Sequence, residues 1–314
     1  MPSDALLARC AKSWDLRNLV FVRKMENIVF SCDSGVGKVY LRLTTPLRRA
    51  RQEIEAEINW IDHLAKCHLP VPHIIPNNQG HKVVSFTEGS DNYEAVVFSA
   101  IAGEHPSKEM VVKPEFLRTL GALIAKMHLA SQRYEGTHQG FKREEWFEER
   151  GLRHALAAAA TSTQTILRQR LEQAVTWMKQ LPRTPETYGL IHADLGALNL
   201  FISDDGSIAV IDFDDSCHHW FAFDLAIVVY SMALRFNHMT RQTNEATWLK
   251  NLVEGYRTIR PLTDEEIDWI PKFIDFAFLR LFFWIEHHES LHTFYDDAIE
   301  HTTQLKQNAL SRLL

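Results

Sequence analysis

The sequence predicts an α+β protein in which strands and helices occupy different parts of the chain. Short apolar and β-branched runs, separated by turn residues, are concentrated before residue 100. From Pro114 onward, apolar residues recur at helical spacing instead. A run of strands followed by a run of helices is typical of the α+β class. We therefore expect a lobe of antiparallel strands at residues 1–100 and a mainly helical lobe at residues 101–314.

Length and composition limit the classes to which this protein can belong. The 314 residues, 46% of them hydrophobic, are enough for one large domain or for two lobes with their own cores. A net charge of −6 argues against a general nucleic-acid partner, since such proteins are usually basic. We expect no membrane partner, because the chain has no signal-like segment and no run of about 18 apolar residues. Four scattered cysteines without metal-site spacing indicate reduced thiols and a cytoplasmic location. The oligomeric state stays open.

The first part of the chain begins with a predicted helix and three predicted strands. Apolar residues at helical spacing predict the helix within residues 1–18. Apolar and β-branched runs predict strands at 19–22, 27–31 and 38–43. Residues 33–37 predict a hairpin turn. Gly37 and Lys38 do not indicate a phosphate loop of the type G-x-x-x-x-G-K-[ST]. The first glycine of that motif is absent, and Val39 replaces the Ser/Thr.

An amphipathic helix and two further strands complete this lobe. The helix is predicted at residues 47–66, before prolines that cannot continue it. Its apolar stripe consists of Ile54, Ile58, Ile61 and Leu64. Strands are predicted at 81–86 and 93–98, and a glycine-containing connector at 99–104 is typical of a hinge between two lobes.

The rest of the chain is predicted to be mainly helical. Residues 132–150 are polar and aromatic and predict a loop on the substrate side. The helical segments are expected at about 115–131, 151–181, 225–234 and 248–314.

Residues 190–214 combine a predicted hairpin with polar residues at both of its ends. An Asp-Gly turn lies between apolar runs at 200–202 and 208–211, which is a strong hairpin signal. The polar residues on the two sides of the hairpin are His192, Asp194, Asn199, Asp212 and Asp214. We expect the hairpin to fold these two groups toward the same place.

This set of residues fits phosphoryl transfer. That reaction needs one carboxylate to orient and deprotonate a hydroxyl, and oxygen ligands for Mg²⁺ on the nucleotide phosphates. Asp194 suits the role of the base. Asn199 and Asp212 suit the role of metal ligands, and Asp214 is an additional candidate ligand.

The spacing of these residues carries a family resemblance. Protein kinases have H-R-D-x-x-x-x-N followed by D-F-G, and this chain has H-A-D-L-G-A-L-N followed by D-F-D. The pattern resembles that of the aminoglycoside phosphotransferase and choline kinase family, in the small-molecule branch that includes type II homoserine kinases. The resemblance implies a protein-kinase-like fold with two lobes, and ATP and Mg²⁺ as cofactors.

The resemblance also implies roles for residues of the first lobe. A strand cation should contact the α- and β-phosphates, and Arg42 is well placed on the strand at 38–43, although Lys is more usual. We expect Glu57 to pair with this arginine, with Glu53 as the alternative. The adenine should bond backbone groups in the connector between Ser99 and Ile101, and the sequence does not choose among them.

Three residues of the second lobe have expected structural roles. His192 should shape the catalytic loop rather than transfer protons. Asp224, in a D-L-A sequence similar to that of the family, should hold the loop and also cap the helix that follows it. His128 is expected to be a packed or capping histidine.

These observations predict an ATP- and Mg²⁺-dependent phosphotransferase that acts on a hydroxyl of a small molecule, such as an amino alcohol, an aminoglycoside or a sugar-like compound. Trp220 and Phe221, beside Asp214 and Asp215, would suit an ammonium-bearing alcohol. One alternative is a bacterial stress-response-type protein Ser/Thr kinase, and another is a non-catalytic nucleotide-binding pseudokinase. The acceptor and the choice between ATP and GTP stay open.

Overall fold

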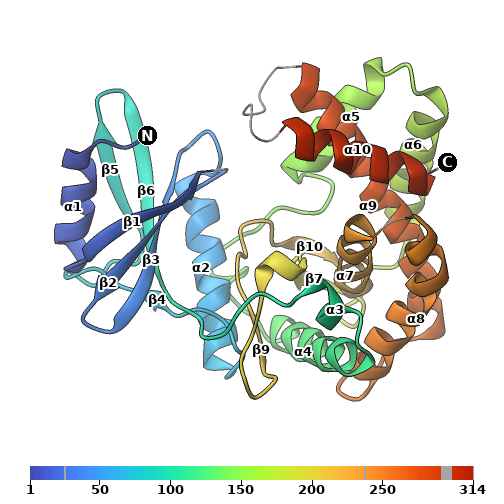
Figure 1. The fold of residues 1–314 in the computed structure, drawn as a ribbon, viewed down its shortest axis with the longest axis horizontal. Coiled ribbons are helices and arrows are strands. Elements are labelled where there is room, and N and C mark those ends of the chain that lie inside the picture. The colour runs from blue at the N-terminus through green and yellow to red at the C-terminus, as the bar shows by residue number, and fades with distance from the viewer. Residues whose placement is uncertain (25, 237, 291–298, 314) are drawn as a thin grey trace. The chain divides into compact units, whose positions relative to one another are not determined.

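The computed structural model describes residues 1–24, 26–236, 238–290 and 299–313, and it confirms the predicted α+β class (Figure 1). The chain forms two compact units. The first comprises Met1–Glu104, Tyr134–Arg143 and Phe201–Asp214, and the second comprises His105–Arg133, Glu144–Leu200 and Asp215–Leu314. The predicted hairpin and the D-F-D sequence therefore belong with the strands of the first unit.

An antiparallel sheet forms the framework of the first unit. Its strands follow the order β1-β2-β3-β6-β4, and β5 pairs with β6. They are β1 (Arg17–Lys24), β2 (Ile28–Ser34), β3 (Gly37–Thr44), β4 (Ile74–Ile75), β5 (Val84–Glu88) and β6 (Asp91–Ser99). The β2–β3 hairpin closes with Ser34 opposite Gly37, and φ is +106° at Gly37, where glycine is favoured. This confirms the predicted turn.

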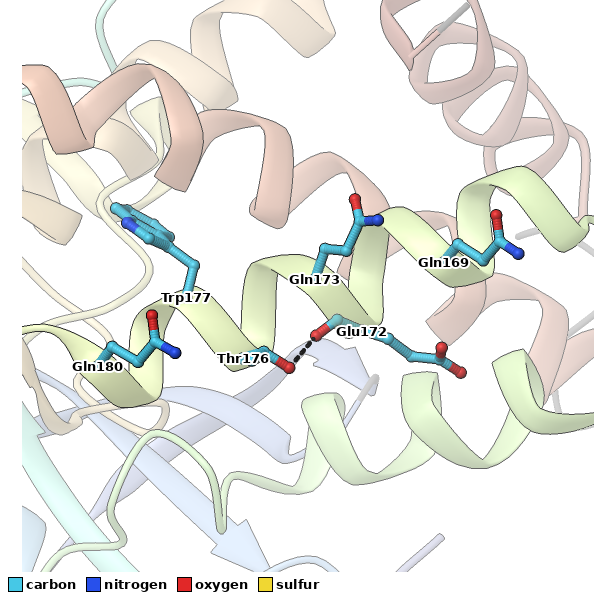
Figure 2. A pocket seen from close by; sticks show the side chains of 6 residues that line it. All are labelled: Gln169, Glu172, Gln173, Thr176, Trp177 and Gln180. Carbon is cyan, nitrogen blue, oxygen red and sulfur yellow. Dashed lines mark hydrogen bonds between the residues drawn. The ribbon is translucent and has the colours of Figure 1, made fainter.

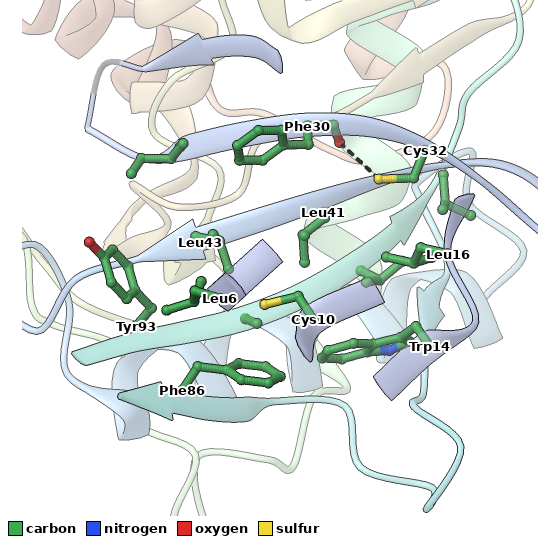
Figure 3. Packing of buried hydrophobic residues seen from close by; sticks show 14 residues of the cluster. Leu6, Cys10, Trp14, Leu16, Phe30, Cys32, Leu41, Leu43, Phe86 and Tyr93 are labelled. Carbon is green, nitrogen blue, oxygen red and sulfur yellow. Dashed lines mark hydrogen bonds between the residues drawn. The ribbon is translucent and has the colours of Figure 1, made fainter. Parts of the chain in front are cut away.

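The two helices of the first unit flank this sheet (Figure 1). Helix α1 (Asp4–Trp14) begins at Ser3, whose hydroxyl accepts a hydrogen bond from the amide of Leu6 at 3.2 Å. Its buried side chains pack with strand residues into one apolar cluster, in which Cys10 and Trp14 lie close to the sheet (Figure 3). Helix α2 (Arg51–Lys66) buries the predicted apolar stripe.

Helix α2 begins four residues later than predicted. The amides of Arg48 and Arg49 donate to the carbonyl of Thr45, so a turn occupies the expected first residues. The helix itself is capped by Glu53, whose carboxylate accepts from the amide of Ala50 at 2.7 Å.

The predicted late hairpin is confirmed as β8 (Leu200–Ile202) and β9 (Ile208–Val210). Ile202 forms a bridge with Glu104, just after the connector that follows β6. A Cβ atom on Gly103 would lie 2.3 Å from the carbonyl oxygen of Ile202, so the close approach of these two backbones requires glycine.

The second unit is mainly helical, as predicted (Figure 1). Its helices are α3 (Lys108–Val111), α4 (Pro114–Gln132), α5 (Arg150–Thr161), α6 (Thr165–Gln180), α7 (Phe221–Arg235), α8 (His238–Arg257), α9 (Asp264–Ser290) and α10 (Ile299–Leu313). β7 (Tyr188–Ile191) and β10 (Cys217–Trp220) form a short antiparallel pair. β7 precedes the predicted catalytic loop, and β10 follows the D-F-D sequence. Residues 291–298 of the predicted C-terminal helical region lie outside the described residues. Within the described ranges, every helix is too short or too polar to span a membrane.

Candidate active site

Arg42 on β3 pairs with Glu57 on α2. The guanidinium Nη1 and Nη2 donate to the two carboxylate oxygens at 2.8 and 2.6 Å, and the residues are 6% and 1% exposed. Burial alone would lower the pKa of Arg42, but the charge of Glu57 opposes it and the pKa is raised. Glu53 bonds Arg49 instead, so Glu57 is the partner of Arg42. The bidentate geometry fixes the direction of a permanently charged group.

The connector after β6 has several backbone groups already in use. The amide of Ser99 donates to the carbonyl of His73 at 2.9 Å, and the amide of Ala100 donates to the carbonyl of Lys38 at 3.1 Å. The hydroxyl of Ser99 accepts from the amide of His73 at 3.0 Å. Ile101 is the next residue in the connector, beyond these two bonded amides.

The residues of the D-F-D sequence have three different environments. Asp212 has a side chain that is 27% exposed, and its carboxylate accepts from Arg23 at 2.9 Å. Its φ of +64° lies in the left-handed region, which Asp tolerates better than most residues. Phe213 is buried and packs edge-on against Trp60 of α2, with ring centroids 5.3 Å apart.

Asp214 is buried among arginines and is only 4% exposed. Arg48 donates from Nε and Nη2 to one carboxylate oxygen at 3.1 and 2.7 Å, and Arg49 donates to the other at 3.4 Å. Arg49 and Arg143 also donate to the backbone carbonyl of Asp214, at 3.0 and 2.5 Å. Burial would raise the pKa of this carboxyl, but the neighbouring arginines lower it, so the group is an anion.

In the second unit, the catalytic loop has its own internal geometry. The Nδ2 group of Asn199 donates to the backbone and carboxylate oxygens of Asp194, both at 2.8 Å. The amide of Asp194 donates to Nδ1 of His192 at 3.2 Å. Ala193, between them, has a φ of +65°. A non-glycine residue with this backbone persists only where its surroundings hold it.

Asp224 supplies that hold. Its carboxylate accepts from the amides of His192 and Ala193 at 3.1 and 2.8 Å, which confirms the predicted anchor. The second part of the prediction was wrong, because α7 begins at Phe221 and Asp224 therefore lies within its first turn rather than at the cap.

His128 on α4 is a packed histidine, as predicted, and it supports Asp224. Its Nε2 lies 3.1 Å from the Asp224 carboxylate, and its Nδ1 lies 2.9 Å from the hydroxyl of Tyr256. Burial lowers the pKa of His128 although Asp224 opposes the shift. Tyr256 was not predicted, since one tyrosine on an amphipathic helix carries no signal in the sequence.

Each unit carries an oxygen donor of the kind that a hard divalent cation accepts. Asp212 provides a partly exposed carboxylate in the first unit. In the second, the two hydrogen bonds from Nδ2 of Asn199 orient its amide so that the oxygen is the atom available to a cation. Carboxylate and amide oxygens are ligands that Mg²⁺ accepts.

The predicted contribution of Trp220 and Phe221 to the acceptor site was wrong. Trp220 and Phe221 are both completely buried, and each packs inside the second unit. Trp220 stacks on Phe273 at 6.0 Å, and Phe221 lies against His128 at 4.6 Å. These rings stabilise the core, which is the commoner use of large aromatic side chains.

An open hollow in the second unit lies on one face of α6. Its lining residues all belong to this helix and include none of the predicted site residues. Figure 2 shows its lining by Gln169, Glu172, Gln173, Thr176, Trp177 and Gln180. The hydroxyl of Thr176 is bonded to the carbonyl of Glu172. These side chains are those of an exposed helix face and carry none of the chemistry expected for phosphoryl transfer.

The fold and these local geometries define a phosphotransferase of the kinase type. Residues 20–266 match the model of the phosphotransferase enzyme family, and the chain belongs to that family. Amicoumacin kinase of Bacillus subtilis is 27% identical over 259 residues, which cover 81% of this chain and 75% of that protein. A homoserine kinase of Methylobacillus flagellatus is 27% identical over 256 residues, covering 80% and 73%.

Solved structures confirm the predicted protein-kinase-like fold. An amicoumacin kinase in complex with AMP-PNP, Ca²⁺ and Ami has a TM-score of 0.87 at 23% identity, covering 99% of this chain and 94% of that one. The microcompartment-associated aminopropanol kinase has a TM-score of 0.78 at 25% identity, covering 99% and 95%.

Proposed function

We propose that this protein transfers the γ-phosphoryl group of ATP, with Mg²⁺, to a hydroxyl of a small molecule. Amino alcohols, aminoglycosides and sugar-like compounds are the acceptor classes that we propose. The names of the relatives support this choice, since amicoumacin, homoserine and aminopropanol are all small molecules. The observation that carries the proposal is the local order around Asp194, whose carboxylate is oriented by Asn199 within a loop held by Asp224.

Asp194 is the proposed base. Its carboxylate would orient the acceptor hydroxyl and take its proton as the phosphoryl group is transferred, a contribution on the order of 10²–10⁴ in rate. His192 accepts a hydrogen bond from the amide of Asp194, so we assign it the shaping of the loop and not proton transfer.

The nucleotide and its metal would use the remaining predicted residues. We assign Mg²⁺ to Asn199 and Asp212, which offer the oxygen donors described above. Bound Mg²⁺ neutralises charge on the phosphates. Arg42, oriented by Glu57, would contact the α- and β-phosphates. The adenine ring would bond the backbone of Ile101 rather than that of Ser99, because the amides of Ser99 and Ala100 are already bonded within the protein. The contacts of Asp214, the third predicted ligand, favour a different role.

A cytoplasmic location fits this proposal. ATP is the proposed phosphoryl donor, and Cys10, Cys32, Cys67 and Cys217 are thiols rather than members of disulfides. Free thiols in a folded protein are typical of reducing compartments.

A screen for ADP release tests the function. The purified protein is incubated with ATP and Mg²⁺ and with amino alcohols, aminoglycosides, sugars or a generic protein acceptor. We expect acceptor-dependent ADP release with a small molecule, which Asp194→Asn abolishes and Asp204→Asn, in the exposed hairpin turn, retains. Phosphorylation of the protein acceptor alone would instead identify a protein kinase. ATP binding without transfer to any acceptor would identify a pseudokinase.

A further inference from the structure

The second aspartate of the D-F-D sequence has contacts that a metal ligand does not need. Both of its carboxylate oxygens accept hydrogen bonds from Arg48 or Arg49, and its backbone carbonyl accepts from Arg49 and Arg143. Arg143 also donates to the backbone carbonyl of Glu53 at 3.0 Å. Asp214 thus lies at the centre of an arginine cluster, which we define as Arg48, Arg49 and Arg143.

The carboxylate of Asp214 lies within 4.8 Å of those of Glu26 and Asp215, an acidic group that could hold a metal ion, but the charges of the arginine cluster argue against a cation at Asp214. A divalent ion on this carboxylate would have to displace guanidinium groups at 2.7–3.4 Å or lie beside them. Repulsion between like charges is strong where water is largely excluded, and Asp214 and Arg49 are both almost completely buried. Asp212 differs from Asp214, because its carboxylate is partly exposed and bonds Arg23, which is itself half-exposed.

The cluster instead fastens the D-F-D sequence to the beginning of α2. Arg48 and Arg49 lie in the turn that precedes this helix, and Phe213 packs against Trp60 within it. The same helix carries Glu57, which orients Arg42. Asp212 precedes these two attachment points and has a left-handed backbone that its surroundings must maintain.

We propose that Asp214 is a positioning residue, which fixes the neighbouring Asp212 to the start of α2 through Arg48 and Arg49. The metal-binding carboxylate of Asp212 and the Arg42–Glu57 pair are then both positioned by the same helix. This inference rests on the proposed function, because it takes Asp212 as a metal ligand. Residues that orient a metal ligand commonly change metal affinity roughly ten- to a hundredfold when they are lost.

The variant Arg48→Met distinguishes a positioning role of Asp214 from a role as metal ligand, because the two roles predict opposite changes in metal affinity. If Asp214 positions Asp212 through the arginines, loss of Arg48 should weaken metal binding about tenfold, as Asp214→Asn does. If Asp214 is itself a ligand, Arg48→Met frees its carboxylate from a competing cation, so metal affinity should stay the same or rise.

The experiment measures Mn²⁺ affinity of the full chain with saturating AMP-PNP by calorimetry, because Mn²⁺ shares the oxygen preference of Mg²⁺. The variants are Asp212→Asn, Asp214→Asn, Arg48→Met, Arg48→Lys and the Asp214→Asn/Arg48→Met double variant. We expect the double variant to bind Mn²⁺ no more weakly than Asp214→Asn, since both changes break the Arg48–Asp214 connection and the other ion pair of Arg48 is with the half-exposed Glu26. Asp212→Asn should weaken binding more than any of these. Arg48→Lys should recover part of the loss, and Asp204→Asn serves as the matched control.

Several outcomes would overturn the proposal. Unchanged or tighter Mn²⁺ binding by Arg48→Met would do so, and so would additive losses in the double variant. If Asp214→Asn fails to fold, as judged by its thermal transition, the comparison of Arg48→Met with Arg48→Lys still decides the sign. Absence of phosphoryl transfer by the wild-type protein would count against the proposed function alone, because the Mn²⁺ titration needs no acceptor.

Discussion

The two units hold their functional groups by different physical means. In the first unit, charged side chains hold one another, as in the Arg42–Glu57 pair and the arginine cluster around Asp214. In the second, one buried carboxylate, Asp224, holds backbone amides of the catalytic loop. The difference predicts different responses to mutation. Removing one member of a charge pair leaves a buried charge, whereas removing Asp224 leaves unbonded amides and a backbone free to relax.

The largest expected effect on stability is at the buried ion pair. Glu57→Ala should lower the free energy of unfolding by about 3–5 kcal/mol, because it leaves the guanidinium of Arg42 buried without its partner. Chemical denaturation followed by circular dichroism measures this loss.

A double replacement separates the stability of this pair from its function. Arg42→Met/Glu57→Met should recover most of the lost stability, since buried pairs are often replaced by apolar residues at little cost. Its nucleotide affinity should stay low, because the proposed phosphate cation is gone. A double variant that binds AMP-PNP normally would remove Arg42 from the nucleotide site.

Asp224→Ala tests the other means of support. It removes the acceptor for the amides of His192 and Ala193, and we expect a loss of about 3 kcal/mol in the free energy of unfolding. Turnover of the folded protein should fall strongly, because the left-handed backbone at Ala193 loses its hold. Asp224→Asn keeps one acceptor oxygen and should fall between wild type and Asp224→Ala. Equal turnover of all three proteins would contradict the anchoring role.

The smallest expected effect concerns the pH dependence of stability. Burial lowers the pKa of His128 from its ordinary value of 6.5. As the pH falls below 6.5, this histidine therefore binds a proton more readily in the unfolded chain than in the folded protein. Its contribution to stability is therefore complete above pH 6.5 and is lost as the pH falls below it. His128→Gln should flatten the stability profile in this range by at most about 1.4 kcal/mol per pH unit. Urea denaturation at pH 5.5 and 7.5 compares the proteins, and parallel profiles would show that folding does not lower the pKa of His128.

Features that depend on spacing within one short segment were the most predictable from the sequence. The Asp194-to-Asn199 spacing and the Asp-Gly turn lie within one short stretch, and so both were accessible without a structure. The Arg42–Glu57 pair was also predicted, with Glu53 as the alternative partner, because the family resemblance implies a strand cation that is oriented by a glutamate of the following helix.

Contacts between distant segments could not be predicted in the same way. Arg48, Arg49 and Arg143 meet Asp214 only after folding, and in the sequence they indicate no more than solvated charges. Burial was equally hidden for Trp220, since an aromatic residue beside acidic ones is compatible with either a pocket or a core. Strands β4, β7 and β10 were also missed, because two to four residues are too few for any periodicity.

Single-turnover kinetics of Asp194→Asn test whether this carboxylate is the base, with an acceptor found in the screen and AMP-PNP affinity measured on the same preparation. We predict nucleotide affinity close to that of wild type and a rate of phosphoryl transfer reduced about 10²-fold or more. A folded Asp194→Asn protein that transfers phosphate at nearly the wild-type rate would contradict it.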